Sequence, residues 1–248
     1  MTIRLLLVSA LCLIQSLAIS QVINPEFDNV AKKFEQSKFE SALETAEALM
    51  DNDKHRKKPE PYLWASMCYY EISKSDDEKL LERWKNPMRN ALKYAGKAVS
   101  KDKNGNLVEN NAEYFALMKE AGIAEALQWE KEENYRKSSY AYKQILEFAP
   151  EDVYVQFAKG VTDIRLNAFF DAERTIREAF PIIEESFRDL NYEPDPISSP
   201  LLKPNVLYYI DHLIENSYAD SARKVTMAAR VFFPLDEEVK SKLQAIEQ

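Results

Sequence analysis

Glycine is strongly under-represented in this chain. Only 4 of the 248 residues are Gly, whereas average composition would give about 17. Gly-rich loops that bind phosphates or dinucleotides need several glycines at fixed spacing, so sites of that kind are excluded. The tight turns of an all-β fold also depend on Gly, and 30% of the residues are charged. With abundant Ala, Leu, Glu and Lys, the composition predicts an all-α fold.

Cysteine and histidine are almost absent as well. The chain has two Cys and two His, and the histidines, His55 and His212, are far apart in sequence. Zinc binding and His-dependent nucleophilic catalysis therefore have little support, and no nucleophile elbow or Walker loop is present. We expect no cofactor, no metal ion and no enzymatic activity.

One segment partly matches a calcium-binding loop. In "SKDKNGNLVEN", Asp102 and Asn104 occupy ligand positions, but Asn111 stands where a bidentate Glu is needed. The simpler interpretation is that Asn104 and Gly105 turn the chain between two helices.

The N-terminus has the pattern of a secretory signal peptide. Arg4 precedes an apolar run that ends near Leu17, and small residues lead up to Ser20. We predict cleavage of residues 1–20 and a periplasmic or secreted protein with no integral membrane span after cleavage. A lipoprotein signal at Cys12 is the alternative; Ser9, Ala10 and Leu11 are a poor approach to a lipidated Cys, but lipidation stays open.

Charge and the remaining cysteine limit the partners. Removal of Arg4 leaves 32 of the 33 basic residues against 41 acidic ones, a net charge of −9. An acidic surface repels nucleic acid and anionic lipid, so neither is an expected partner. Cys68 alone remains, so no internal disulfide can form and stability must come from packing.

An internal repeat is visible around residues 134–150, "NYRKSSYAYKQILEFAP". Its apolar residues recur at steps of three and four, which predicts a helix, and Pro150 predicts that one helix ends before the next begins. A shift of 34 residues places Tyr135 on Phe169 and Ser138 on Ala172, and the small Ala126 on Gly160. A period of 34 residues with helical patterns indicates an array of helix pairs.

These residues resemble the tetratricopeptide repeat family. Its pattern has a small residue midway along the first helix, an aromatic that opens the second helix, an Ala three residues later, and a closing Pro. "EALQWEKEENYRKSSYAYKQILEFAPED" matches this pattern, although Ser138 stands where Ala is usual, and "FAKGVTDIRLNAFFDAERTIREAF" matches without the closing Pro. "FDNVAKKFEQSKFESALETAEALM" fits more loosely.

The resemblance implies a right-handed α-solenoid of about five helix pairs with a C-terminal capping helix, in a single repeat domain over residues 21–248. We predict repeats near 24–53, 60–102 with an insertion at 73–87, 119–152, 153–186 and 203–234, and a cap at 235–248, where Asp236 is a plausible N-cap. Small residues let paired helices approach closely, so we interpret the following as packing residues: Ala42, Ala91, Ala126, Gly160 and Ala172.

In this family the first helix of each pair lines a concave groove. The resemblance places these residues there: Leu63, Met67, Tyr70, Ile123, Leu127, Phe157, Val161 and Ile164. Nearly all are apolar, and an apolar surface of this kind is usually covered. A partner segment is one possible cover; the connection at 189–204 or the final helix is the other. Trp84, in the insertion, is a second candidate binding residue, although a short helix packed on its own repeat is the simpler interpretation.

From exported members of the family we expect a protein-binding scaffold or adaptor, with a protein partner in a bacterial envelope, secretion or outer-membrane assembly. The competing hypothesis is an accessory protein of an envelope enzyme system that binds a polar small molecule or a glycan, for instance near Tyr69, Tyr70 and Glu71. The acidic residues at 130, 132 and 133 are expected to form a solvated helix face.

Overall fold

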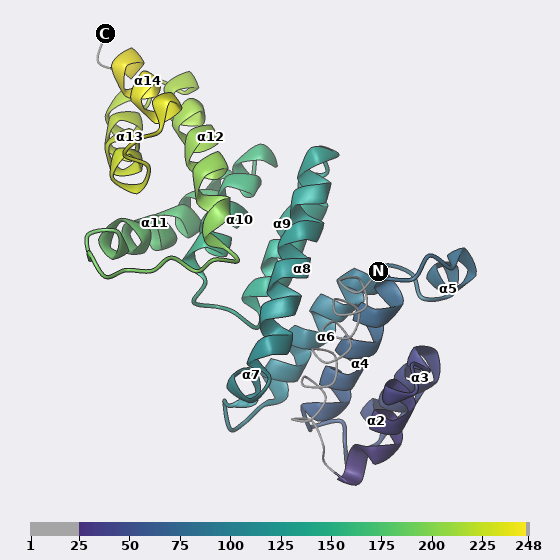
Figure 1. The fold of residues 1–248 in the computed structure, drawn as a ribbon. Helices are drawn as coiled ribbons and strands as arrows, with labels where there is room; N and C mark the ends of the chain where they lie inside the picture. Colours follow the sequence, from purple (N-terminus) through teal and green to yellow (C-terminus); the bar gives the residue numbers. More distant parts are fainter. Residues whose placement is uncertain (1–24, 247–248) are drawn as a thin grey trace, which may run out of the picture. The chain divides into compact units, whose positions relative to one another are not determined.

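The computed structural model describes residues 25–246, and this part of the chain is all-α, with no β-strand (Figure 1). The proposed signal peptide at 1–20 lies outside the described residues. Most of the helices form pairs, four of them joined by a short turn and one by a longer connection. The pairs are α2 (Asp28–Glu35) with α3 (Phe39–Asp51), α4 (Glu60–Ser73) with α6 (Pro87–Lys101), α8 (Ala112–Lys131) with α9 (Tyr135–Leu146), α10 (Val153–Arg165) with α11 (Phe169–Ser186), and α12 (Leu202–Glu215) with α13 (Ala219–Phe232).

Five shorter elements complete the described chain: η1 (Pro25–Phe27), α5 (Glu78–Arg83), α7 (Leu107–Asn110), η2 (Ser199–Leu201) and α14 (Glu237–Ile246). α5 lies in the segment that the sequence marks as an insertion. α8 begins at Ala112 rather than near residue 119, because Asn111 O already accepts a helical hydrogen bond from Phe115 N at 3.0 Å. Asp236 Oδ1 caps α14 by accepting from Val239 N at 3.1 Å, which confirms the predicted cap.

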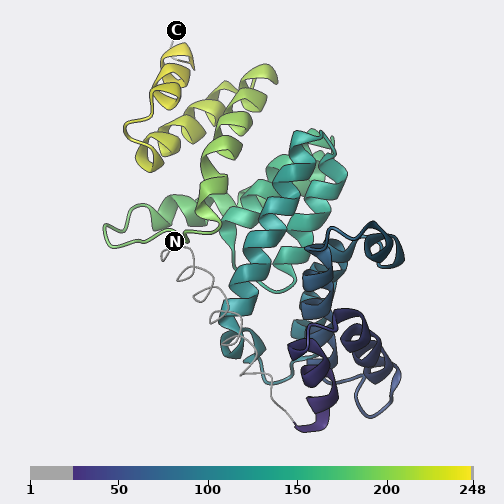
Figure 2. The same cartoon turned by 45° about the vertical axis from the view of Figure 1, so that its right-hand side comes forward.

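The chain divides into two compact units. The first comprises the described part of Met1–Glu125 together with Glu147–Pro150, and the second comprises Ala126–Leu146 with the described part of Glu151–Gln248. In the first unit, Phe34 packs against Phe39 and Trp64, with ring centroids 5.2 and 5.6 Å apart. In the second unit, α10 contacts α11, and α12 contacts α13; both views in Figures 1 and 2 show the members of each pair side by side.

Four of the turns within pairs have the same backbone geometry. A non-glycine residue adopts the left-handed conformation in each: Ser37, Glu133, Asn167 and Ser217, with φ of 56°, 55°, 58° and 63°. The next N–H donates to the carbonyl five residues earlier at 2.8 to 2.9 Å, for example from Asn134 to Trp129. This is the Schellman motif, which satisfies carbonyls at a helix C-terminus. Glu133 and Asn167 are 34 residues apart, the period found in the sequence.

Small residues lie where paired helices cross, as the sequence predicts. A Cβ atom added to Gly160 would lie 2.7 Å from Ile176 Cγ1, so α10 and α11 touch at this point. In the first unit, Ser66 Oγ donates to Ala91 O at 2.7 Å, which ties α4 to α6. All five predicted packing positions are buried, so the interpretation of these residues as packing residues is confirmed.

The loop between α6 and α7 is a turn. Gly105 has φ of 73°, the left-handed region that Gly adopts without strain. Both oxygens of Asp102 accept backbone hydrogen bonds, Oδ1 from Asn104 N at 3.0 Å and Oδ2 from Leu107 N at 2.6 Å. The Asp102 carboxylate therefore holds the loop itself.

Candidate functional site

The side chains expected to line an open groove are mostly enclosed. Six of the eight are buried: Leu63, Met67, Ile123, Phe157, Val161 and Ile164. Tyr70 and Leu127 are half-buried. The exposed apolar surface expected at these positions is therefore not present in the described part of the chain. A partner could reach them only if the surrounding helices separated, so partner binding there stays a prediction without structural support.

The second unit shows why these positions are enclosed. α10 is contacted by α9, α11 and α12. The ring of Phe157 lies 5.5 Å from that of Phe180 on α11 and 6.2 Å from that of Tyr209 on α12. Val161 and Ile164 belong to the same buried cluster. In this unit α10 therefore contacts the neighbouring pair through the very face that the resemblance assigned to a ligand.

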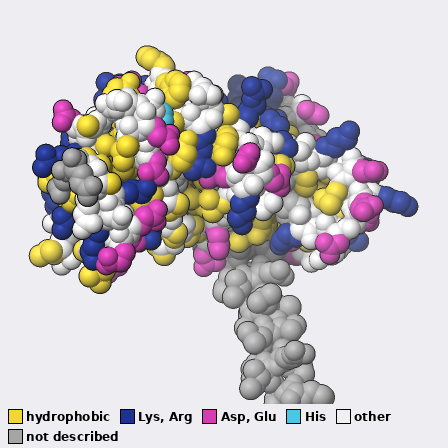
Figure 3. Space-filling view, turned by 90° about the horizontal axis from the view of Figure 1, so that it is seen from above, with side chains coloured by type: hydrophobic (Ala, Val, Ile, Leu, Met, Phe, Trp, Pro, Cys, Tyr) yellow, Lys and Arg dark blue, Asp and Glu magenta, His cyan; other side chains and the backbone are white. Residues whose placement is uncertain are grey.

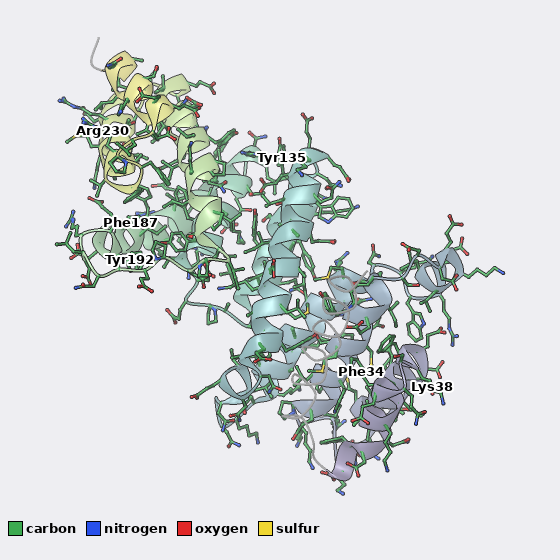
Figure 4. The ribbon with its side chains drawn as sticks, viewed as in Figure 1. Phe34, Lys38, Tyr135, Phe187, Tyr192 and Arg230 are labelled. Atoms are coloured by element: carbon green, nitrogen blue, oxygen red, sulfur yellow. The ribbon has the colours of Figure 1, made fainter. Side chains whose placement is uncertain are left out.

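The connection after α11 covers part of α10 as well. Tyr192 and Tyr154 share a hydrogen bond between their hydroxyls at 2.7 Å, and the Phe187 and Tyr192 rings are 5.5 Å apart. Figure 4 shows these two rings at the end of α11 and in the segment that follows it. Cover by the chain itself, one of the two possibilities that the sequence left open, thus accounts for this part of α10.

The Trp84 side chain makes contacts within the fold. It follows α5, and its Nε1 donates to Glu40 Oε1 on α3 at 2.9 Å. Its ring meets Tyr69 edge-on at 6.0 Å, and the Arg83 guanidinium lies 5.3 Å above it. α5 also contacts α4. The insertion thus contains a short helix, as expected, but it packs both on Tyr69 of its own repeat and on Glu40 of the preceding repeat.

The residues considered for polar-ligand binding are engaged internally. Tyr69 OH donates to Glu47 Oε1 at 3.1 Å and its ring stacks on Tyr94. Burial, and then the nearby Glu47 carboxylate, raise the pKa of Tyr69. Glu71 pairs with Lys74 at 2.6 Å. Tyr69 and Glu71 already have partners within the fold, so these contacts do not favour the small-molecule hypothesis.

A buried carboxylate was missed by sequence reasoning. Glu130 was expected on a solvated face, but its side chain is only 12% exposed. Its Oε1 accepts hydrogen bonds from Ser138 at 3.1 Å and Thr162 at 3.0 Å, so α8, α9 and α10 are joined at one atom. Ser138, which departs from the family's Ala, is thereby explained. No periodicity could reveal this, because the partners of Glu130 come from two other helices.

Arg165 balances this carboxylate. One of its Nη atoms lies 3.9 Å from Glu130 Oε2, and its guanidinium lies 4.1 Å above the Tyr208 ring and 5.3 Å above the Tyr135 ring. Figure 4 marks Tyr135 at the start of α9. Burial, and then the Glu130 carboxylate, raise the pKa of Tyr142 beside them. These contacts indicate a structural role rather than a reaction site, because the Glu130 carboxylate is engaged by Ser138, Thr162 and Arg165.

The second unit also contains a surface groove of about 420 Å³ between α11 and α13, which we call the α11–α13 groove. It is lined by these residues: Glu184, Arg188, Asp220, Arg223, Lys224, Met227, Ala228 and Val231. The buried Phe232 on α13 packs against Phe187, with ring centroids 4.7 Å apart. This contact joins α13 to the C-terminal end of α11.

Charged and apolar groups alternate in this groove. Met227 is 56% exposed and Val231 is 57% exposed. Arg188 is neutralised by Glu184 and Glu185, both at 2.9 Å. Within residues 25–246, no salt bridge joins Arg223 or Lys224 to an acidic group. The face in Figure 3 likewise shows hydrophobic, basic and acidic side chains interspersed.

Metal-ligand clusters and membrane-spanning helices are both missing from the described chain. Between residues 25 and 246, no three His, Cys, Asp or Glu side chains are grouped so as to hold a metal ion. None of the helices in that range has the length and apolar character needed to cross a membrane.

Comparison with known proteins identifies no family for this chain. No protein-family model matches the chain, and no curated protein matches it. The resemblance to tetratricopeptide repeats therefore depends on the residues quoted from the sequence.

Proposed function

We propose that this protein is an exported scaffold or adaptor that binds a partner protein, built as an α-solenoid of about five tetratricopeptide-like helix pairs. The recurrence of the Schellman turn supports the repeat architecture. Two of these turns are 34 residues apart, at Glu133 and Asn167, and Gly160 lies where two paired helices touch. Repeat arrays of this kind commonly present surfaces for protein binding.

The proposed location is a bacterial envelope, as part of a secretion or outer-membrane assembly. It depends on the N-terminal pattern of Arg4, an apolar run and small residues, and on the resemblance to exported family members. Because fold alone does not determine function, the N-terminal pattern supports the location and the family resemblance supports the assembly.

The observation that carries the binding proposal is the α11–α13 groove. It exposes Met227 and Val231 beside Arg223 and Lys224. Exposed apolar side chains with charged neighbours are typical of the centre and rim of a protein interface. The positions expected from the family are buried instead, so we place the partner on this groove.

The test is crosslinking in the native envelope followed by identification of the partner and of the crosslinked residues. Met227→Glu with Val231→Glu is compared with Leu190→Glu, a fully exposed apolar side chain outside the groove. We expect the double variant to lose one defined crosslink to α13 while the control keeps it, with circular dichroism unchanged in both. Retention of the same partner by the folded double variant would refute the assignment of the groove.

A further inference from the structure

The outward face of α13 is basic, although the chain as a whole is acidic. Arg223, Lys224 and Arg230 are all exposed on it, in a protein of net charge −8. α13 has no acidic residue after Asp220. Met227 is three or four residues from each of these cations, and Val231 is four residues after Met227. Residues at this spacing lie on the same face of a helix. We call these five side chains the basic face of α13.

The cations on α11 and just after its end provide a contrast within the same unit. Arg174 pairs with Asp171 at 3.1 Å and Arg177 with Glu173 at 3.5 Å, and Arg188 is neutralised by two Glu residues. Within the described part of the chain, the three cations of α13 form no salt bridge. Positive charge on α13 is thus available for an external partner, whereas on α11 it is neutralised internally.

We propose that the α11–α13 groove binds an acidic amphipathic helix of the partner protein. Apolar side chains of this helix would fill the groove against Met227, Ala228 and Val231, and its carboxylates would pair with the unpaired cations. The inference depends on the proposed scaffold function and specifies the partner's chemistry. Insertion of a helix into a groove through regularly spaced apolar anchors is a recurrent mode of recognition.

The spacing of the cations limits the arrangement further. Arg223 and Arg230 are seven residues apart, which is about 10 Å along a helix axis. A partner helix that runs along α13 therefore places two acidic residues about seven positions apart, with an apolar residue between them opposite Met227. Charge complementarity of this kind determines register and partner choice more than bulk affinity.

An anionic membrane is the less suitable occupant. Asp220 and Glu184 line the groove, and Glu185 lies beside Arg188. These carboxylates repel a continuous negative surface. A helix can place its own basic or neutral residues opposite them, so the mixed charge of the groove favours a protein segment.

The test uses purified, folded protein and synthetic helical peptides followed by fluorescence polarisation. The first peptide has Glu at two positions seven apart around a Leu, the second has Lys at both positions, and the third is a scrambled form of the first. We expect only the first to bind, and its affinity to fall as salt rises, because exposed charge pairs are screened.

Two charge-reversed variants test whether the cations of α13 bind the peptide. Arg223→Glu with Arg230→Glu should weaken binding of the Glu peptide at least tenfold and gain binding of the Lys peptide. Arg174→Glu with Arg177→Glu, on α11, is the matched control and should change neither. Equal loss in the control, binding of anionic vesicles in place of the peptide, or self-association through α13 would each overturn the proposal.

The two proposals fail separately. If the envelope crosslink to α13 is present but the Glu peptide does not bind, the acidic-helix chemistry is wrong and the scaffold function stands. If the crosslink is absent as well, the scaffold function at this groove is refuted.

Discussion

At the residue scale, position 160 shows how one missing side chain determines a helix contact. A Cβ there would approach Ile176 Cγ1 to 2.7 Å and the Ala172 carbonyl oxygen to 3.4 Å. The separation of 2.7 Å from Ile176 Cγ1 is shorter than Cβ atoms in proteins show to other heavy atoms. The two helices therefore need Gly at this position, despite its poor helix propensity.

We predict that Gly160→Ala destabilises the protein by about 1 to 3 kcal/mol, because the overpacking cost exceeds the helix-propensity gain of about 1 kcal/mol. Urea unfolding measures the change. In a double-mutant cycle, Ile176→Ala should relieve much of the cost of Gly160→Ala, because it removes the clashing atom. Additive effects of the two substitutions would show that the contact is not tight.

A second residue-scale prediction concerns acid. Hydrogen bonds from Lys54 and Lys58 hold the pKa of Glu26 at about 2, against an ordinary 4.5. A carboxylate with a depressed pKa stabilises the fold above its unfolded pKa, and this contribution is lost as pH falls. We expect the Glu26 pairing to contribute stability above about pH 4.5 and to lose it between 4.5 and 2.

The measurement is the thermal midpoint of wild type and Glu26→Gln from pH 2 to pH 6. The two curves should converge at the acid end and separate as pH rises. Lys54→Ala with Lys58→Ala should move the Glu26 carboxyl titration, followed by NMR, back towards its ordinary range. A constant difference between the curves at every pH would contradict the assignment.

At the scale of elements, the turns within pairs repeat a costly conformation without glycine. The left-handed residues are Ser37, Glu133, Asn167 and Ser217. The left-handed conformation costs an ordinary L-residue about 1 to 2 kcal/mol, and Asn tolerates it better than most. The scarcity of Gly thus leaves strain in the turns of this fold.

We predict that Glu133→Gly stabilises the protein by up to about 1 kcal/mol, because relief of strain exceeds the entropy that Gly loses on folding. Asn167→Gly is the internal comparison and should gain less, and Glu133→Val should destabilise. Chemical denaturation ranks the three variants. A loss of stability in Glu133→Gly would mean that the Glu133 side chain contributes more than its backbone costs.

At the scale of the whole molecule, helix-pair arrays are stabilised mainly by contacts between neighbours. Phe157 packs within the buried cluster formed by α10 to α14, whereas Trp64 packs against Phe34 on α2. A substitution that weakens one cluster should therefore destabilise the helices of that cluster more than the helices of the other.

We predict that Phe157→Ala accelerates amide hydrogen exchange in α10 to α13 at least tenfold while α2 to α6 change little, since truncation of a buried Phe costs about 3 to 5 kcal/mol. Trp64→Ala should give the reverse pattern. Exchange followed by mass spectrometry distinguishes the two regions. Uniform acceleration along the chain would show that it unfolds as one cooperative unit.

Local features of this protein were determined by its sequence. The all-α class, the end of α9 before Pro150, the Asp236 cap and the packing role of Gly160 depend on neighbours within a few residues or on the period of 34. The turn at Gly105 belongs to the same group, because it needs only its own backbone torsions.

Which side chains face solvent was decided only by the tertiary structure. Phe157 and Val161 have the pattern of a groove, yet packing against the neighbouring helices buries them, and Glu130 has the pattern of a solvated face but accepts hydrogen bonds from two other helices. The groove on α13 also depends on how α11 packs beside it. Periodicity shows which residues share a helix face, but burial of that face depends on how other helices pack against it.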